Sequence, residues 1–265
     1  RRSTALYAAA LLAATTCATT CATACAPASA SLAPLAPLPP GGHRVLFIGN
    51  SLTYVNDLPR TLADLAASVG DTIRTASVAY PNYALIDHLT SGDALRAIAA
   101  DRWEYVIMQQ GPTSTTGVDR DTLILAARAF EPYVHAAGGR SALFMVWPDI
   151  TRRAFWGNCR DSYRLAAQAV SGVFMPAGEA WRIAWATDST LALYGGDGFH
   201  PSPLGTYTAA LVMYERITGK DARALPRRAV VEGRTLDAPE NTIRVLQEAA
   251  HRVNTDPTLQ PLFRR

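Results

Sequence analysis

From Arg44 onward, short apolar runs alternate with longer amphipathic segments. This alternation is typical of βα units, in which parallel strands form one sheet and helices cover both of its faces. We therefore expect an α/β fold with a mainly parallel, five-stranded sheet. The expected strands are RVLFIG (44–49), TIRTASVAY (72–80), YVIMQ (105–109), SALFMVW (141–147) and VFMPAG (173–178).

The amphipathic segments predict the helices. Asp57-Leu58-Pro59 is a start signal, because aspartate caps helix N-termini and proline fits the first helical turn. Apolar residues repeat at helical spacing after it and in the last segment. The other expected helices lie at 122–137, 160–170, 179–186, 203–217 and about 243–253.

Polar and small residues follow several of the expected strands. In open parallel sheets, ligands bind beyond the carboxyl ends of the strands. We therefore expect the fold to gather segments that are far apart in the sequence, namely 49–51, 80–83, 109–114 and 147–149.

Composition excludes some classes of protein. Hydrophobic residues make up 49% of the chain and charged residues 18%, which is ordinary for a folded globular protein and excludes disorder of the whole chain. The net charge of +3 comes from scattered arginines, without a block of like charges. A nucleic-acid partner is therefore not expected.

The first 42 residues differ from the rest. Arg1 and Arg2 precede the apolar stretch ALYAAALLAA, which has the length of a signal-peptide core and is too short for a permanent membrane span. We expect a signal peptide or lipoprotein leader at 1–30, a Pro/Ala-rich linker at 31–42 and one domain at 43–265. The expected location is the periplasm or the exterior of the cell.

Three of the four cysteines, Cys17, Cys21 and Cys25, lie inside this leader. Their spacing superficially suggests a metal site, but no histidine accompanies them, and Cys25 is a candidate for a lipid anchor instead. Cys159 is alone in the expected domain, which excludes an internal disulfide there.

Ser51 directly follows the first expected strand, in FIGNSLTYVNDLP. Serine is a common helix N-cap, but Asp57 is better placed to cap the helix that follows. A nucleophilic serine at the end of a strand also explains Gly49, which lets the backbone turn sharply. Both roles remain open at this point.

The loop DGFHPSPLG contains Asp197 and His200, three residues apart. One turn brings the carboxylate against Nδ1–H of the imidazole, and such a contact prepares Nε2 to take a proton from a serine. The alternative is a helix-capping aspartate beside a solvated histidine.

FIGNSL together with DGFHPSPLG resembles the SGNH, or GDSL-type, hydrolase family, and the resemblance covers residues 43–265. It implies a three-layer, flavodoxin-like α/β/α fold, with Ser51 as nucleophile, His200 as general base and Asp197 as its partner. Many members have GDS where this chain has GNS. An α/β-hydrolase fits less well, because its elbow normally has glycine at the position of Thr53.

The resemblance also implies an oxyanion hole with three donors, and here the sequence departs from the family. The Ser51 amide is the first donor. Asn82 is the best match to a glycine after strand two, since asparagine tolerates a left-handed backbone. Thr113 stands where members have an asparagine after strand three, so Gln109 and Gln110 are candidates to supply that side-chain amide. The alternative is that both glutamines only form hydrogen bonds with the loop backbone.

Tyr54, Tyr83 and Trp147 are expected near strand ends, where they are candidates to line a substrate pocket. The resemblance implies an exported serine esterase that requires no metal or organic cofactor. Its expected substrate is a small-molecule or glycan ester, with acetyl groups on carbohydrate preferred. The alternatives are a lipase or aryl esterase, and a non-catalytic carbohydrate-binding protein on a hydrolase scaffold.

Overall fold

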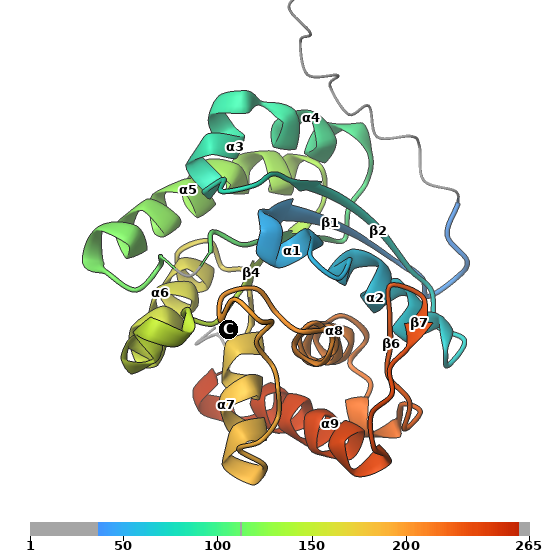
Figure 1. Cartoon of the computed structure of the whole chain (residues 1–265). Coiled ribbons are helices and arrows are strands. Elements are labelled where there is room, and N and C mark those ends of the chain that lie inside the picture. Colours follow the sequence, from blue (N-terminus) through green and yellow to red (C-terminus); the bar gives the residue numbers. More distant parts are fainter. Residues whose placement is uncertain (1–36, 112, 260–265) are drawn as a thin grey trace, which may run out of the picture. The chain divides into compact units, whose positions relative to one another are not determined.

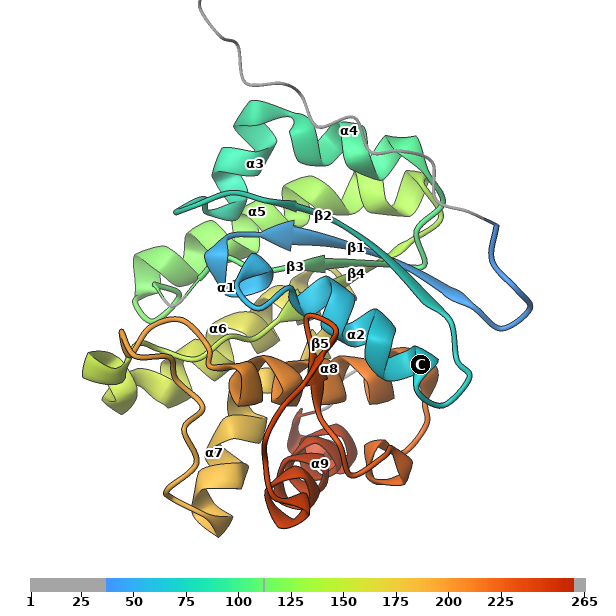
Figure 2. The same cartoon turned by 45° about the vertical axis from the view of Figure 1, so that its right-hand side comes forward.

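A computed structural model describes residues 37–111 and 113–259. The leader and the first half of the linker predicted from the sequence lie outside these residues. Five parallel strands form the main sheet in the order β2-β1-β3-β4-β5 (Figures 1 and 2). The strands are β1 (His43–Gly49), β2 (Ile73–Ala79), β3 (Tyr105–Met108), β4 (Arg140–Phe144) and β5 (Val173–Met175). The prediction of a five-stranded parallel sheet is confirmed.

Helices cover both faces of this sheet. One face carries α3 (Leu85–Ser91), α4 (Asp93–Ala100), α5 (Gly117–Ala136) and α6 (Trp156–Ala169). The other carries α2 (Leu58–Ala67) and α8 (Pro203–Thr218), with α7 (Ala177–Thr187) and α9 (Glu240–Thr255) packed on α8 (Figure 1). The result is the predicted three-layer arrangement.

The central strands contain continuous apolar runs, and helices cover these runs on both faces of the sheet. Val45, Leu46, Phe47 and Ile48 of β1 are at most 1% exposed. A strand buried on both faces has a continuous apolar run instead of an alternating pattern, and the sequence shows such runs at these strands. These strands are the centre of the hydrophobic core.

Several short elements were not predicted. They are α1 (Ser51–Tyr54), the pair α3 and α4, the 3₁₀ turns η1 (Ile150–Phe155), η2 (Ala222–Ala224) and η3 (Pro257–Leu259), and a hairpin of β6 (Val230–Val231) and β7 (Arg234–Thr235). The helix predicted at 122–137 begins earlier, at Gly117, because Thr116 caps it by accepting from the Asp119 N–H. None of the helices among the described residues is long and apolar enough to cross a bilayer.

The strand order places a topological switch point at the carboxyl ends of β1 and β3. In the sheet, β2 lies on one side of β1 and β3 lies on the other side. The connections that follow β1 and β3 therefore run in opposite directions along the sheet. In doubly wound sheets this switch point is where ligands bind. Ser51 follows β1 directly and therefore lies at the switch point.

Candidate active site

Ser51 lies at the sharp turn between β1 and α1. The Asn50 side chain accepts a hydrogen bond from the Leu52 N–H at 3.1 Å and so caps α1. Asp57 caps α2 by accepting from the Arg60 N–H at 3.2 Å, as the sequence predicts. Other residues thus cap both helices, and within 37–111 and 113–259 the Ser51 hydroxyl has no hydrogen-bond partner.

Asp197 and His200 contact each other in the loop before α8. Nδ1 of His200 lies 2.6 Å from Oδ2 of Asp197. The backbone N–H groups of Phe199 and His200 donate to the other carboxylate oxygen, both at 3.0 Å. These hydrogen bonds, that from the imidazole foremost, lower the pKa of Asp197 to about 2. A charged acceptor on Nδ1–H leaves Nε2 available to accept a proton.

The segment after β4 holds the Asp197–His200 loop in place. The Trp147 indole N–H donates to Phe199 O at 3.1 Å, and the Ile150 N–H donates to Gly198 O at 2.8 Å. Gly198 has a φ of +67°, and a Cβ there would lie 2.6 Å from the Ile150 side chain. The loop is therefore fixed on both sides of its central glycine.

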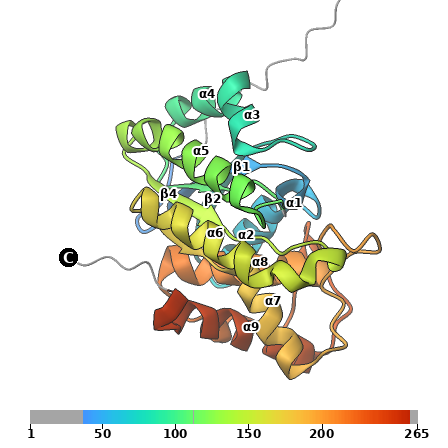
Figure 3. The same ribbon diagram turned by 90° about the vertical axis from the view of Figure 1, so that its left-hand side faces the viewer.

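Asn56 joins the segment that follows Ser51 to the same loop. Its Nδ2 donates to Pro201 O at 2.9 Å and to the Thr206 hydroxyl at 3.0 Å. Figures 2 and 3 show α1 and the loop before α8 on the same side of the sheet. The structure thus brings the segment of the predicted nucleophile to the loop of the predicted acid and base.

Trp147 does not line an open pocket, which corrects the prediction. Its side chain is 1% exposed and stacks on Trp181, with ring centroids 3.5 Å apart. Trp147 is therefore a packing residue that also fixes the loop of His200. Tyr54 is 41% exposed and Tyr83 is partly exposed, so both remain candidates for contact with a ligand.

Asn82 has a φ of 61°, which lies in the left-handed region. This is the backbone conformation expected for Asn82 if it takes the place of the family's glycine after strand two. It lies in the exposed turn after β2, and β2 runs beside β1 with Ala79 opposite Gly49. Among the described residues, no acceptor binds the backbone N–H of Asn82 or of Ser51. Both N–H groups are free to bind a ligand.

Each of the two glutamines after β3 uses its side-chain amide in hydrogen bonds within and between loops. Oε1 of the fully buried Gln109 accepts from the Asn50 N–H and the Thr53 hydroxyl, both at 3.0 Å, and its Nε2 donates to Asn50 Oδ1 at 2.9 Å. Gln110 is 5% exposed, and its Nε2 donates to Asp119 O at 3.2 Å. Both side chains hold loops together.

His88 of α3 has a structural role. Its imidazole is fully buried, and Nε2 lies 2.7 Å from Gly49 O. The rings of Tyr80 and Tyr83 pack on it at centroid distances of 5.7 and 5.0 Å. Burial lowers the pKa of His88, so the ring is neutral and donates from Nε2.

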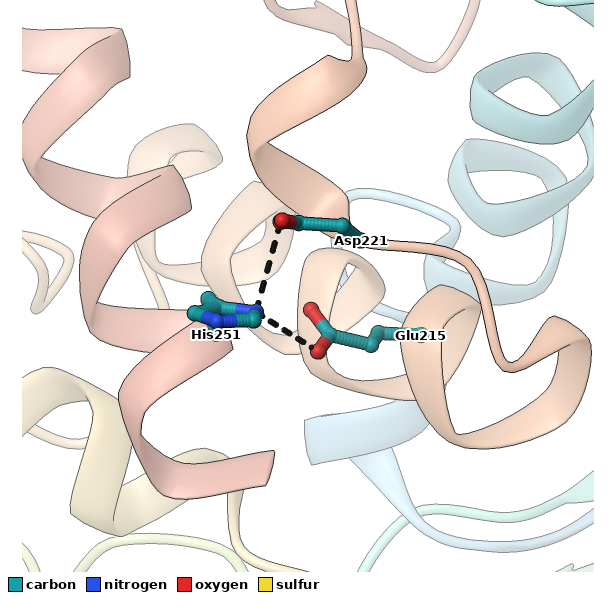
Figure 4. A group of neighbouring side chains, drawn as sticks. All are labelled: Glu215, Asp221 and His251. Atoms are coloured by element: carbon teal, nitrogen blue, oxygen red, sulfur yellow. Dashed lines mark hydrogen bonds and ion pairs between the residues drawn. The ribbon is translucent and has the colours of Figure 1, made fainter. Parts of the chain in front are cut away.

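A second group of polar side chains lies far along the chain, where α8, η2 and α9 meet (Figure 4). Nδ1 of His251 is 2.9 Å from Glu215 and 3.3 Å from Asp221. Arg223 donates to both oxygens of Asp221, with the shortest contact at 2.7 Å, and lowers the pKa of Asp221 to about 2. Direct contacts between the side chains, including the Arg223–Asp221 ion pair, account for this cluster, which joins three elements.

No protein-family model and no curated protein matches the sequence. Solved structures do match. A DUF4886 family protein from Bacteroides uniformis has 19% identity and a TM-score of 0.69, over 83% of this chain and 98% of its own. A protein assigned as an SGNH hydrolase, from Slackia heliotrinireducens, has 24% identity and a TM-score of 0.56, over 66% and 98%.

A lipase/acylhydrolase from Enterococcus faecalis also matches, with 13% identity and a TM-score of 0.53, over 69% of this chain and 97% of its own. At these identities the likeness concerns the fold. The chain therefore has the fold of SGNH-type hydrolases, and the resemblance predicted from the sequence is confirmed at that level.

Proposed function

We propose that the protein is a serine ester hydrolase in which Ser51 is the nucleophile, His200 the general base and Asp197 the partner of the base. The contact of 2.6 Å between His200 and Asp197 carries this proposal, because its loop binds Asn56, five residues after Ser51, and Ser51 itself is freed from helix capping. Neither a buried structural histidine nor a capping aspartate explains that arrangement.

In the proposed reaction, Nε2 of His200 takes the Ser51 proton as Oγ attacks the ester carbonyl. The charged Asp197 holds Nδ1–H and stabilises the imidazolium that forms. The tetrahedral intermediate then expels the alcohol, which receives the proton from His200. Water attacks the resulting acyl-enzyme by the same route and releases the acid. The reaction requires no metal and no organic cofactor.

The free backbone N–H groups of Ser51 and Asn82 are the proposed donors to the oxyanion. Both were in the expected set, and the side-chain amides of Gln109 and Gln110 are not proposed as donors, since they are buried and bound to other groups. An oxyanion donor lowers the barrier by about 3 to 4 kcal/mol in acyl transfer, so each N–H is important for the rate.

Short acyl esters of carbohydrates are the proposed substrates. The exposed ring of Tyr54 and the partly exposed ring of Tyr83 support this class, because aromatic rings present flat, amphipathic surfaces. A lipase or aryl esterase is the second candidate. It is favoured by Ile150, which is 51% exposed beside Gly198 and offers an apolar surface near His200.

The test is to label the purified protein with a fluorophosphonate and to locate the adduct. We expect labelling at Ser51 that Ser51→Ala and His200→Ala abolish and the exposed control Ser189→Ala retains. An unlabelled, folded protein that still binds glycans would support the non-catalytic alternative.

Relative rates on acetylated sugars and on p-nitrophenyl esters of increasing chain length decide between the two substrate classes. Preference for acetyl groups supports the carbohydrate esterase, and preference for long chains supports the lipase.

Export is also part of the proposal, although the leader and Cys25 fall outside the described residues. Mass spectrometry of the protein isolated from its native cell would identify the cleavage site and any lipid on Cys25.

A further inference from the structure

Asn50 connects the loops that follow three neighbouring strands. Its Oδ1 accepts from the Leu52 N–H at 3.1 Å and from Gln109 Nε2 at 2.9 Å. Its Nδ2 donates to Tyr83 O at 3.0 Å and to Gln110 O at 3.3 Å. Both acceptor positions of Oδ1 and both hydrogens of Nδ2 are thus in use. The residue is only 6% exposed, so the protein itself supplies all four partners.

Backbone groups determine which way this carboxamide points. The Leu52 N–H is a donor and requires an oxygen opposite it, whereas the carbonyls of Tyr83 and Gln110 are acceptors and require an N–H. Gln109 is oriented in the same way, because its oxygen must face the Asn50 N–H. Its Nε2 then meets Asn50 Oδ1, and the two amides bind each other.

The contacts of Asn50 fix the positions of both proposed oxyanion donors. The Ser51 N–H belongs to the peptide bond between Asn50 and Ser51. The Asn82 N–H lies one residue before Tyr83, whose carbonyl group Asn50 binds. The loop after β3 closes over the same point, since a Cβ on Gly111 would lie 3.0 Å from Asn50 Nδ2. A shift of one donor loop therefore requires hydrogen bonds to Asn50 to break.

We propose that Asn50 is a positioning residue for the oxyanion hole and that it acts by donating hydrogen bonds to Tyr83 O and Gln110 O. An aspartate of the same shape, as in the GDS form of the motif, has no hydrogen to donate when ionised. It would face two carbonyl oxygens and separate the loops. In this chain, restoring GDS by Asn50→Asp should impair the reaction instead of improving it.

This inference rests on the proposed function, because it concerns donors for the same reaction. A misplacement of about 1 Å at a catalytic centre typically costs about 100-fold, so we expect kcat of Asn50→Asp to fall about 100-fold near pH 8, with KM little changed. Retained KM separates a misplaced donor from a lost substrate site.

The way in which the loss of kcat in Asn50→Asp depends on pH distinguishes lost hydrogen-bond donation from other structural damage. A buried carboxyl group has a raised pKa, and its protonated form donates one hydrogen bond to a carbonyl oxygen. The ratio of wild-type to variant kcat should therefore decrease from about pH 8 to about pH 5. The titratable groups that face this point are Tyr83 and His88 on one side and the Tyr163 hydroxyl, which accepts from the Gln110 N–H at 3.0 Å.

The experiment compares Asn50→Asp with wild type and with Asn241→Asp, which makes the same substitution on the exposed first turn of α9. The titratable neighbours of Asn50 are the same in wild type and variant, as are Ser51 and His200, so the ratio of kcat values isolates residue 50. Asn241→Asp should retain wild-type kcat at each pH. Full activity of Asn50→Asp, or a deficit that is constant with pH, would overturn the inference.

Asn50→Ala provides a second readout, which replaces the first if Asn50→Asp does not fold. It removes all four hydrogen bonds without adding charge, so kcat should fall without recovery in acid. A folded and fully active Asn50→Ala would also overturn the inference. Failure of the proposed function is distinguishable, because the wild type itself would then show no fluorophosphonate adduct on Ser51.

Discussion

Gly49 has no space for a side chain, although its backbone conformation is ordinary. A Cβ at this position would lie 2.4 Å from Gln109 Oε1 and 2.5 Å from Thr53 Oγ1. Both atoms are fixed, because the Thr53 hydroxyl and the Asn50 N–H each donate to Gln109 Oε1 at 3.0 Å. The glycine two residues before the proposed nucleophile is thus required by packing and not by its backbone conformation.

Gly49→Ala should therefore lower the free energy of unfolding by about 1 to 3 kcal/mol, the usual cost of overpacking a core. Gly117→Ala at the start of α5 is the matched control, since no atom lies within 4 Å of its added Cβ, and a change within about 1 kcal/mol is expected. Urea denaturation measures both. Equal stability of the two variants would contradict the packing role of Gly49.

At the scale of elements, the apolar runs of the buried strands were the strongest signal, and all five strands of the main sheet were predicted from them. The helices α3 and α4 were missed because they are short and are divided by Gly92, whose φ of +74° ends one helix and precedes the next. The pairing of Asn50 with Gln109 was also missed. These residues are 59 positions apart and meet only through the register of β1 and β3.

His88 gives α3 a pH-dependent contribution to stability. Burial lowers its pKa in the folded protein below the ordinary value of 6.5, so the unfolded chain binds the proton more strongly. The free energy of unfolding should therefore decrease as pH falls below about 6.5 and level off below the lowered pKa, with a slope of at most about 1.4 kcal/mol per pH unit.

His88→Gln keeps an N–H donor for Gly49 O but does not titrate. We expect its stability to change less than that of the wild type between about pH 8 and pH 5, as measured by urea denaturation at each pH. His135→Gln, on the exposed end of α5, is the control and should retain the wild-type dependence. Identical profiles for all three proteins would exclude His88 as the source.

At the scale of the molecule, the candidate site depends on contacts between the beginning and the end of the domain. The Asn56 amide lies 145 positions before Pro201 and binds its carbonyl group. The Ser51 segment follows the first strand of the main sheet, whereas the Asp197–His200 loop follows the last strand of that sheet, β5, and helix α7. The sheet order brings the two segments to one side, and Asn56 joins them.

Asn56→Gly tests this connection without straining the backbone, because glycine readily adopts the φ of 58° found there. Loss of the hydrogen bonds to Pro201 O and Thr206 should lower kcat about tenfold by loosening the alignment of His200. Glu232→Gly, at another exposed left-handed residue, is the control and should keep full ester hydrolysis. Unchanged kcat in Asn56→Gly would show that the loop holds its position without Asn56.

The two outer strands of the sheet have a consequence for how the protein behaves in a crowded solution. An unpaired strand edge is a template on which a second chain can add, and it leads to aggregation when it is long and apolar. β5 is three residues long and at most 9% exposed, so it offers little backbone to pair with. β2 is longer but contains Arg74, Thr75 and Ser77, which make its edge a poor partner for an apolar strand.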